Sequence, residues 1–149
     1  MILLHQVEAD TYWCLNIFLA SIRDHYTMDL PGQNRMVNLL ESRMQDIDQD
    51  LWRFLKLSGL EFNLFAFKWM NCLLVREFPF HCIIRMWDTY LSEENLNFEE
   101  IHVYVCAGFL EEFSSELQKM DFEDLFQFIQ RLPTKAWRDA EVELLLSQA

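Results

Sequence analysis

The chain has 149 residues, of which 52% are hydrophobic, and a formal net charge of −12. This length and apolar content suffice for one domain with a core, while the scarcity of glycine and proline, 3 of each, argues against a β architecture built on hairpin turns. The negative charge disfavours nucleic acid and anionic membrane surfaces as partners, because both are anionic and bind basic protein surfaces.

The first sixty residues show helical spacing of apolar side chains and predict three helices joined by short loops. We expect the first at 8–26, the second at 33–46, and a third that begins at Asp48 as its N-cap and ends at Ser58-Gly59. The expected buried positions are Tyr12, Leu15, Leu19, Ile22 and Tyr26, then Met36, Leu40, Met44 and Ile47, then Leu51 and Phe54.

The middle of the chain is its most apolar part. Residues 62–75 are apolar on nearly every helical face, which predicts a helix at the centre of the core that is too short to span a bilayer. Pro79 is expected to end this helix, because proline has no N–H and restricts the residue before it. A following helix is expected to bury Phe80, Ile83, Ile84, Trp87 and Leu91.

The last third predicts a polar loop at 92–97 and three more helices. These are expected at 98–117, from an N-cap at Asp121 to Arg131, and from Pro133-Thr134 to the end of the chain. Their expected buried residues are Ile101, Val105, Phe109 and Phe113, then Leu125, Phe128, Ile129 and Leu132, then Val142, Leu145 and Leu146.

Several ordered motifs run along the chain. They are Glu8-Ala9-Asp10-Thr11-Tyr12-Trp13-Cys14-Leu15, Leu30-Pro31-Gly32-Gln33, Phe65-x-x-x-Trp69, Arg76-Glu77-Phe78-Pro79-Phe80 and Arg85-x-Trp87-Asp88. From about His5 to Ala149 the sequence resembles the C-terminal part of the TBC domain of Rab GTPase-activating proteins, in the pattern of the yeast Gyp-type branch. The resemblance implies an all-α, irregular helical bundle that corresponds to the C-terminal subdomain. It implies that 1–149 is a single partial domain whose N-terminal half, with the catalytic motifs, is absent.

The resemblance also implies a role in regulating a Rab-type small GTPase in vesicle traffic. That family resembles other activators in using an arginine finger, in an I-x-x-D-x-x-R motif, together with a glutamine in a Y-x-Q motif. Both motifs precede the segment that begins here at Glu8. No tyrosine of this chain has glutamine two places later. The stretch Ile47-x-x-Asp50-x-x-Arg53 matches the arginine motif, but it follows the segment that begins at Glu8 instead of preceding it. We interpret Arg53 as an exposed helix arginine. We therefore expect no catalytic residue, and a GTPase activator by resemblance that is inactive in this chain alone.

Two alternatives to a GTPase regulator remain open from the sequence. The chain could be a non-catalytic helical scaffold or adaptor that binds other proteins, or a truncated product without an independent role. Because a missing half would leave apolar surface exposed, we expect a chain that self-associates or is only marginally stable.

Polar residues in and after the apolar segment are the candidate partner-binding residues: Lys68, Asn71, Arg76 and Arg85. The alternative for Lys68 and Asn71 is that both satisfy polar groups inside the fold. The alternative for the arginines is an ion-pair network with Glu77 and Asp88 that braces the Pro79 turn.

The cysteines and histidines show no metal-ligand spacing, so no metal site and no cofactor are expected. Isolated cysteines among apolar neighbours favour free thiols in a reducing compartment. The apolar first residues lack the basic region of a signal peptide. We expect a cytoplasmic protein without direct membrane insertion, held at Golgi or endosomal membranes through its partners.

Overall fold

The computed structural model describes residues 2–92 and 98–148, and every regular element in these ranges is helical. The α-helices are α1 (Ile2–Ser21), α2 (Pro31–Ile47), α3 (Gln49–Leu57), α4 (Ala66–Cys72), α5 (Phe80–Ser92), α6 (Phe98–Glu112), α7 (Ser114–Leu117), α8 (Phe122–Gln130) and α9 (Asp139–Gln148). Short 3₁₀ helices are η1 (Arg23–Tyr26), η2 (Phe62–Leu64) and η3 (Thr134–Ala136). The all-α expectation is confirmed. No helix within the described ranges has the length and hydropathy that a membrane span requires.

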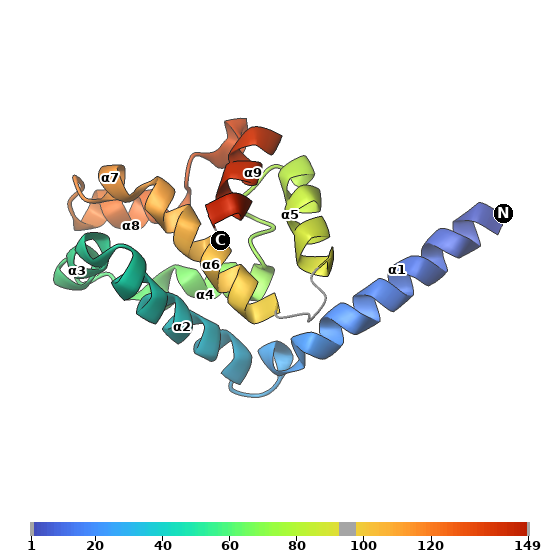
Figure 1. The fold of residues 1–149 in the computed structure, drawn as a ribbon. Coiled ribbons are helices and arrows are strands. Elements are labelled where there is room, and N and C mark those ends of the chain that lie inside the picture. The colour runs from blue at the N-terminus through green and yellow to red at the C-terminus, as the bar shows by residue number, and fades with distance from the viewer. Residues whose placement is uncertain (1, 93–97, 149) are drawn as a thin grey trace.

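Helix α6 lies at the centre of the molecule, with α2, α5 and α9 packed against it (Figure 1). Its buried residues cover nearly all of its faces and include Phe98, His102, Val103 and the unbroken run 105–110. A helix that is apolar on all sides is stable only when neighbours cover every side. The sequence placed 62–75 in this central position, but α6 is the more completely enclosed helix.

An aromatic cluster joins α6 to segments far away in the sequence. The ring of Phe109 lies 5.2 Å from Trp69 of α4 and 4.8 Å from Phe78, and Phe78 lies 5.3 Å from Trp137. Aromatic pairs at such distances add stability beyond the area that they bury. The cluster therefore fixes α4, the segment before α5 and the segment before α9 on one side of α6.

The helix N-caps predicted at Asp48 and Asp121 are confirmed. The side chain of Asp48 accepts a hydrogen bond from the backbone N–H of Leu51 at 2.9 Å, and that of Asp121 accepts one from Asp124 at 3.0 Å. Each bond satisfies an N–H that has no partner within its helix. Gly59 follows α3 with a φ of 78°, a conformation that glycine adopts without steric strain.

Most of the predicted core positions of α2, α3, α8 and α9 are confirmed. The confirmed buried residues are Met36, Leu40, Met44, Leu51, Leu125, Ile129, Leu132, Val142 and Leu145. Partly buried against the core are Phe54, Phe128 and Leu146. Ile47 is exposed, contrary to prediction, because it lies at the very end of α2.

The predicted helix at 62–75 is wrong in extent. It is divided into η2 and α4, and α4 ends at Cys72 instead of continuing toward Pro79. Leu73 and Leu74 then have left-handed φ values of 50° and 60°. Such a backbone costs a non-glycine residue about 1–3 kcal/mol. Both side chains are buried, and burying a leucine contributes about 1.5–3 kcal/mol, which offsets the strain.

Three further boundaries or faces differ from prediction. Helix α5 buries Cys82, Met86 and Tyr90 along with Ile83, while Phe80, Ile84 and Leu91 are exposed. The helix predicted at 98–117 breaks at Phe113, and the last helix begins at Asp139 after η3, not at Pro133. Ser92 belongs to α5, and the rest of the predicted 92–97 loop lies outside the described residues.

Candidate partner-binding surfaces

Helix α1 extends away from the helices that surround α6, so most of its length has no neighbour (Figure 1). It is a helix as predicted, although it begins at Ile2 and ends at Ser21. Among its described side chains only Phe18 is buried. Its other large apolar residues are between 43% and 64% exposed: Leu4, Val7, Tyr12, Trp13, Leu15, Ile17 and Leu19.

The buried stripe predicted for this first helix is therefore wrong at all but one position. Ile22, just after α1, is fully buried, whereas Tyr12, Leu15, Leu19 and Tyr26 are exposed. Helical spacing identified a surface suited to packing, but no described element covers it. Large apolar side chains that gather, exposed, on one helix mark an interaction site in soluble proteins.

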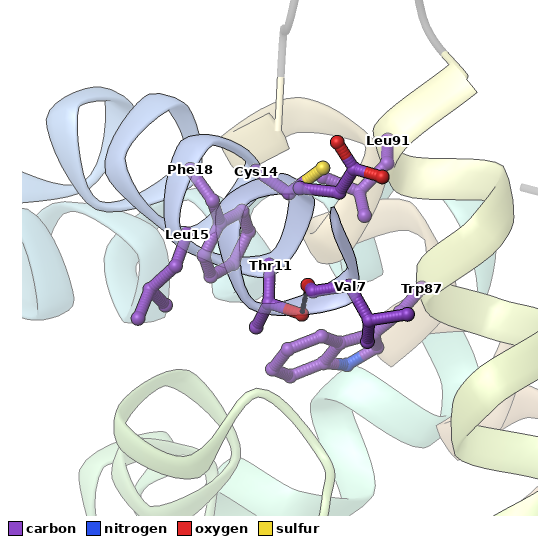
Figure 2. A pocket seen from close by; sticks show the side chains of 8 residues that line it. Val7, Thr11, Cys14, Leu15, Phe18, Trp87 and Leu91 are labelled. Carbon is purple, nitrogen blue, oxygen red and sulfur yellow. Dashed lines mark hydrogen bonds between the residues drawn. The ribbon is translucent and has the colours of Figure 1, made fainter. Parts of the chain in front are cut away.

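A cavity of about 430 Å³ opens between α1 and α5 (Figure 2). Its lining residues are Val7, Asp10, Thr11, Cys14, Leu15, Phe18, Trp87 and Leu91. The rings of Phe18 and Trp87 lie 5.4 Å apart in its wall, and the hydroxyl of Thr11 donates to the Val7 carbonyl at 2.7 Å. With largely apolar walls and no histidine, the cavity suits insertion of apolar side chains rather than acid–base chemistry.

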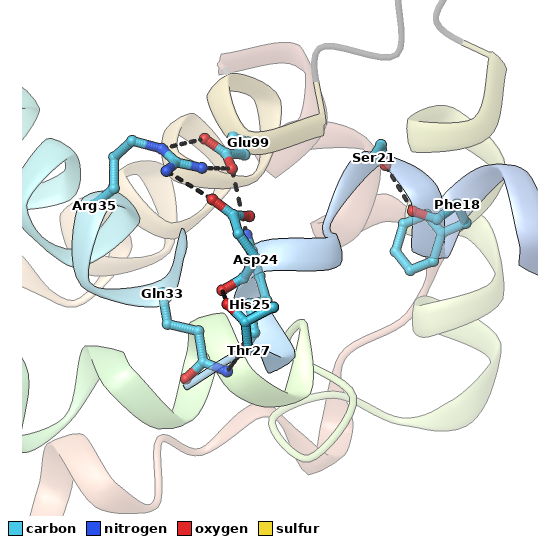
Figure 3. Close-up of polar contacts among 8 residues, drawn as sticks. All are labelled: Phe18, Ser21, Asp24, His25, Thr27, Gln33, Arg35 and Glu99. Atoms are coloured by element: carbon cyan, nitrogen blue, oxygen red, sulfur yellow. Dashed lines mark hydrogen bonds and ion pairs between the residues drawn. The ribbon is translucent and has the colours of Figure 1, made fainter. Parts of the chain in front are cut away.

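A polar cluster ties the turn after α1 to α2 and α6 (Figure 3). Arg35 of α2 donates to Asp24 Oδ2 at 2.9 Å and to both carboxylate oxygens of Glu99, the bond to Oε2 also measuring 2.9 Å. The hydrogen bond from Arg35 lowers the pKa of Asp24, and the two carboxylates raise the pKa of Arg35. Gln33 donates to the backbone carbonyl of the buried His25 at 2.8 Å.

The same cluster brings potential metal ligands together. Ligand atoms of Asp24, His25 and Glu99 lie within 4.8 Å of one another. Arg35 is bonded to both carboxylates, so a cation would have to displace it. Gly32 makes the packing tight, since a Cβ there would lie 2.3 Å from His25 Cδ2. We assign the cluster the role of fixing the direction in which α1 leaves the bundle.

The candidate residues Lys68 and Asn71 have partners inside the fold. Lys68 Nζ lies 2.9 Å from Glu77 Oε1 and donates to the Gln130 carbonyl at 3.1 Å. Asn71 Oδ1 accepts from Gln33 at 3.0 Å, and its side chain remains exposed. Their polar groups are thus satisfied within the chain, as the alternative interpretation required.

The candidate residues Arg76 and Arg85 lie in different surroundings. Arg85 forms a two-pronged pair with Glu143 of α9, at 2.5 Å and 3.0 Å, which raises its pKa. Arg76 is exposed and has no ion pair among the described residues. Because Glu77 pairs with Lys68 and Arg85 pairs with Glu143, the alternative interpretation, a single ion-pair network around Pro79, does not hold.

Sequence reasoning missed the surfaces that the fold assembles from distant segments. Trp87, which was predicted to be buried, is half-buried against the core, and it also lines the cavity beside α1. Arg131 and Lys135 were not singled out, yet they face the same cavity as Lys68 and Arg76. No local sequence pattern reveals that Trp87 lies beside α1, or that Arg131 and Lys135 lie beside Lys68 and Arg76. In each case the residues are more than fifty positions apart in the sequence. Arg53 is exposed on α3, as expected.

Comparison with known proteins identifies the family. The model of the Rab-GTPase-TBC domain matches residues 1–118. The chain is 49% identical over 145 residues to GTPase-activating protein gyp1 of Schizosaccharomyces pombe and 45% identical over 144 residues to human TBC1 domain family member 22A, covering 97% and 96% of this chain. It spans only 28% of either relative. The solved structure of the Ypt/Rab-GAP domain of Gyp1p matches with a TM-score of 0.89 and 48% identity, over 95% of this chain and 44% of that one. The chain belongs to the Rab-GTPase-TBC domain family.

Proposed function

We propose that residues 1–149 form the C-terminal part of a TBC domain and serve in the regulation of a Rab-type small GTPase in vesicle traffic. Family membership supports this role, because relatives that match almost all of the chain are named as GTPase-activating proteins. The partner is then a Rab-family GTPase, and the chain acts in the cytoplasm, next to Golgi or endosomal membranes that its partners occupy.

The observation that carries the proposal is the exposed apolar surface of α1. Side chains such as Trp13 and Leu15 gain nothing from contact with water, and burial of each contributes about 1.5–3 kcal/mol. In the proposed arrangement, the remaining part of the TBC domain packs on this helix and fills the cavity beside Trp87. The orientation of α1, fixed by Arg35 and its two carboxylate partners, presents that surface to the missing part.

The proposed role in this chain is binding without catalysis. Stimulation of GTP hydrolysis needs an arginine that neutralises charge on the transferring phosphoryl group and a group that positions water. The chain has no Y-x-Q motif. The one match to the arginine-finger motif, Ile47-x-x-Asp50-x-x-Arg53, places Arg53 on α3. Charged contacts such as those of Arg76 would supply the salt-dependent part of binding.

Self-association is the expected behaviour of the chain alone. An exposed apolar helix buries its surface against a second copy when its natural neighbour is absent. Sedimentation velocity over a range of concentrations tests this. A compact monomer at every concentration would contradict it, whereas association that Leu15→Ser and Trp13→Ser weaken would support it.

An adaptor function is the second candidate, and the cavity between α1 and α5 favours it. Its apolar walls would accept the apolar face of a helix from a partner other than a GTPase. The two functions differ in whether binding depends on the nucleotide state of a Rab.

The test is single-turnover phosphate release from a panel of GTP-loaded Rab proteins, combined with binding measurements on the GTP-bound and GDP-bound forms. We expect hydrolysis to rise by no more than a few-fold, with measurable, salt-sensitive binding to at least one GTP-bound Rab. About a hundredfold stimulation, on the scale of an arginine finger, would contradict the proposed lack of catalysis. Loss of that stimulation in Arg53→Ala would identify the finger, and its persistence would direct the same test to Arg76 and Arg85. Equal affinity for the GTP-bound and GDP-bound forms of a Rab, or no binding to any Rab, would favour the adaptor function.

A further inference from the structure

A second cavity, of about 730 Å³, lies on a different part of the surface from α1. One wall consists of Lys68 and the segment 76–79, and the other consists of residues 130–136, at the end of α8 and in η3. We call this cavity the basic groove. The family match ends at residue 118, so the second wall lies beyond it.

The basic groove carries positive charge on a strongly acidic protein. Its charged lining residues are Lys68, Arg76, Glu77, Arg131 and Lys135. Glu77 is nearly buried and its charge is balanced by Lys68 at 2.9 Å. Arg76, Arg131 and Lys135 have no ion pair within the part of the chain that the structure describes. Three cations therefore face one cavity without a carboxylate of their own, although the chain has twice as many acidic as basic residues.

Hydrogen bonds fix the second wall against the first wall and against η2. Lys68 donates to the Gln130 carbonyl at 3.1 Å, and Gln130 Nε2 donates to the Leu64 carbonyl at 3.0 Å. The hydroxyl of the buried Thr134 donates to the Glu77 carbonyl. A groove that is already formed spares a ligand the entropy of ordering it.

The groove is also partly apolar. Phe78, Pro79 and Leu132 line it, and Phe78 is anchored against Trp137 and Phe109 of the core. Basic and apolar side chains occur on both walls, which makes the groove complementary to an extended segment that carries both acidic and apolar residues.

We propose that the basic groove is a docking site for an extended segment of a partner protein that carries both acidic and apolar residues. Arg76, Arg131 and Lys135 pair with its carboxylates, while Phe78 and Leu132 contact its apolar side chains. A flat anionic membrane does not enter a concave site, and the net charge of −12 repels such a surface. The groove lies apart from α1 and the cavity beside it and shares only Arg76 with the proposed GTPase contact, so Arg131 and Lys135 test it separately.

The test measures fluorescence anisotropy of a labelled peptide of alternating glutamate and leucine, with a glutamine–leucine peptide as its uncharged counterpart. We expect the acidic peptide to bind the 149-residue chain about tenfold more tightly than the uncharged one, and the preference to shrink as salt is raised. The double variant Arg131→Glu with Lys135→Glu should abolish that preference, and Arg76→Gln should weaken acidic binding about threefold.

The matched control is Arg53→Glu with Lys119→Glu, which makes the same change of charge at exposed positions outside the groove. It should change the affinity by less than about twofold, because distant exposed charges are screened. Equal losses in the two double variants would attribute binding to overall charge and overturn the proposal. Circular dichroism melts establish that each variant is folded, and Arg76→Gln alone supplies the answer if the groove double variant is not.

Inorganic phosphate and phosphatidylserine vesicles test whether the groove binds a peptide specifically or any anion. Inorganic phosphate at matched ionic strength should displace no more peptide than chloride does, and the chain should not co-sediment with phosphatidylserine vesicles. Displacement specific to phosphate, or vesicle binding that Arg131→Glu with Lys135→Glu removes, would make the groove a phosphate or membrane site and contradict the proposal. Equal affinity for the acidic and the uncharged peptide would also contradict the proposal.

Discussion

Helices α1 and α6 are both rich in apolar residues, yet they differ in how much of their surface other helices cover. Helix α6 is enclosed by α2, α5 and α9, whereas most of α1 meets no other helix (Figure 1). Apolar content indicates that a helix belongs in an interface, but it does not say whether the other side of that interface lies in the same chain. In α6 the interface is complete, and in α1 it is open.

The largest expected difference is in the free energy of unfolding. Phe109 of α6 is fully buried among Trp69, Phe78 and Trp137. Phe109→Ala should therefore lower the stability by about 3–5 kcal/mol, from lost transfer energy and a cavity. Urea unfolding measures it, and Phe80→Ala, at a residue that is 78% exposed, is the control with a change below about 0.5 kcal/mol. Equal effects at the two positions would mean that α6 is not the core.

A smaller effect is expected from pH, again inside α6. The imidazole of His102 is buried, with Nδ1 3.1 Å from the Tyr90 hydroxyl and Nε2 3.2 Å from the Trp69 carbonyl. Burial lowers the pKa of His102 from 6.5 to about 4. The unfolded chain then binds a proton that the folded chain does not, so stability is lost as the pH falls below the unfolded value.

The loss due to His102 should be about 1 kcal/mol between about pH 7 and pH 5.5, where carboxylates remain largely ionised. The measurement compares urea unfolding at these two pH values in the wild type and in His102→Gln. The variant should lose less stability on acidification than the wild type. An unchanged difference between the two pH values would show that His102 is protonated equally in both states.

The smallest effect on stability is expected in α1. Leu15 is half exposed, so Leu15→Ala should change the free energy of unfolding by less than about 0.5 kcal/mol. The same change should reduce the fluorescence of an apolar dye such as ANS bound to the chain, because it removes part of the exposed apolar surface. A loss of several kcal/mol would instead place Leu15 in an interface within the chain.

How far the sequence predicts this molecule depends on the range of the interaction. The caps at Asp48 and Asp121 follow from local chemistry and are confirmed. The burial of Met36 and Leu40 follows from periodicity along α2. The exposure of α1 does not, because periodicity describes one helix and not its neighbours.

The candidate sites show the same limit. The sequence indicated that Lys68 needs a polar partner, but not that Glu77 and the Gln130 carbonyl supply it. The basic groove could not be predicted, since only the fold brings Arg131 and Lys135 to the same cavity as Arg76. Likewise, the left-handed turn at Leu73 depends on burial that no local pattern reveals.

The difference between the open interface of α1 and the complete interface of α6 is open to direct measurement. Hydrogen–deuterium exchange tests it on the dilute chain alone and after mixing with the part of the Gyp1p Rab-GAP domain that this chain does not cover. We expect strong protection of α6 amides in both samples, weak protection of α1 amides in the chain alone, and a rise in α1 protection on mixing. Amides of α1 that are as protected as those of α6 before mixing, or that gain no protection from it, would contradict the open interface.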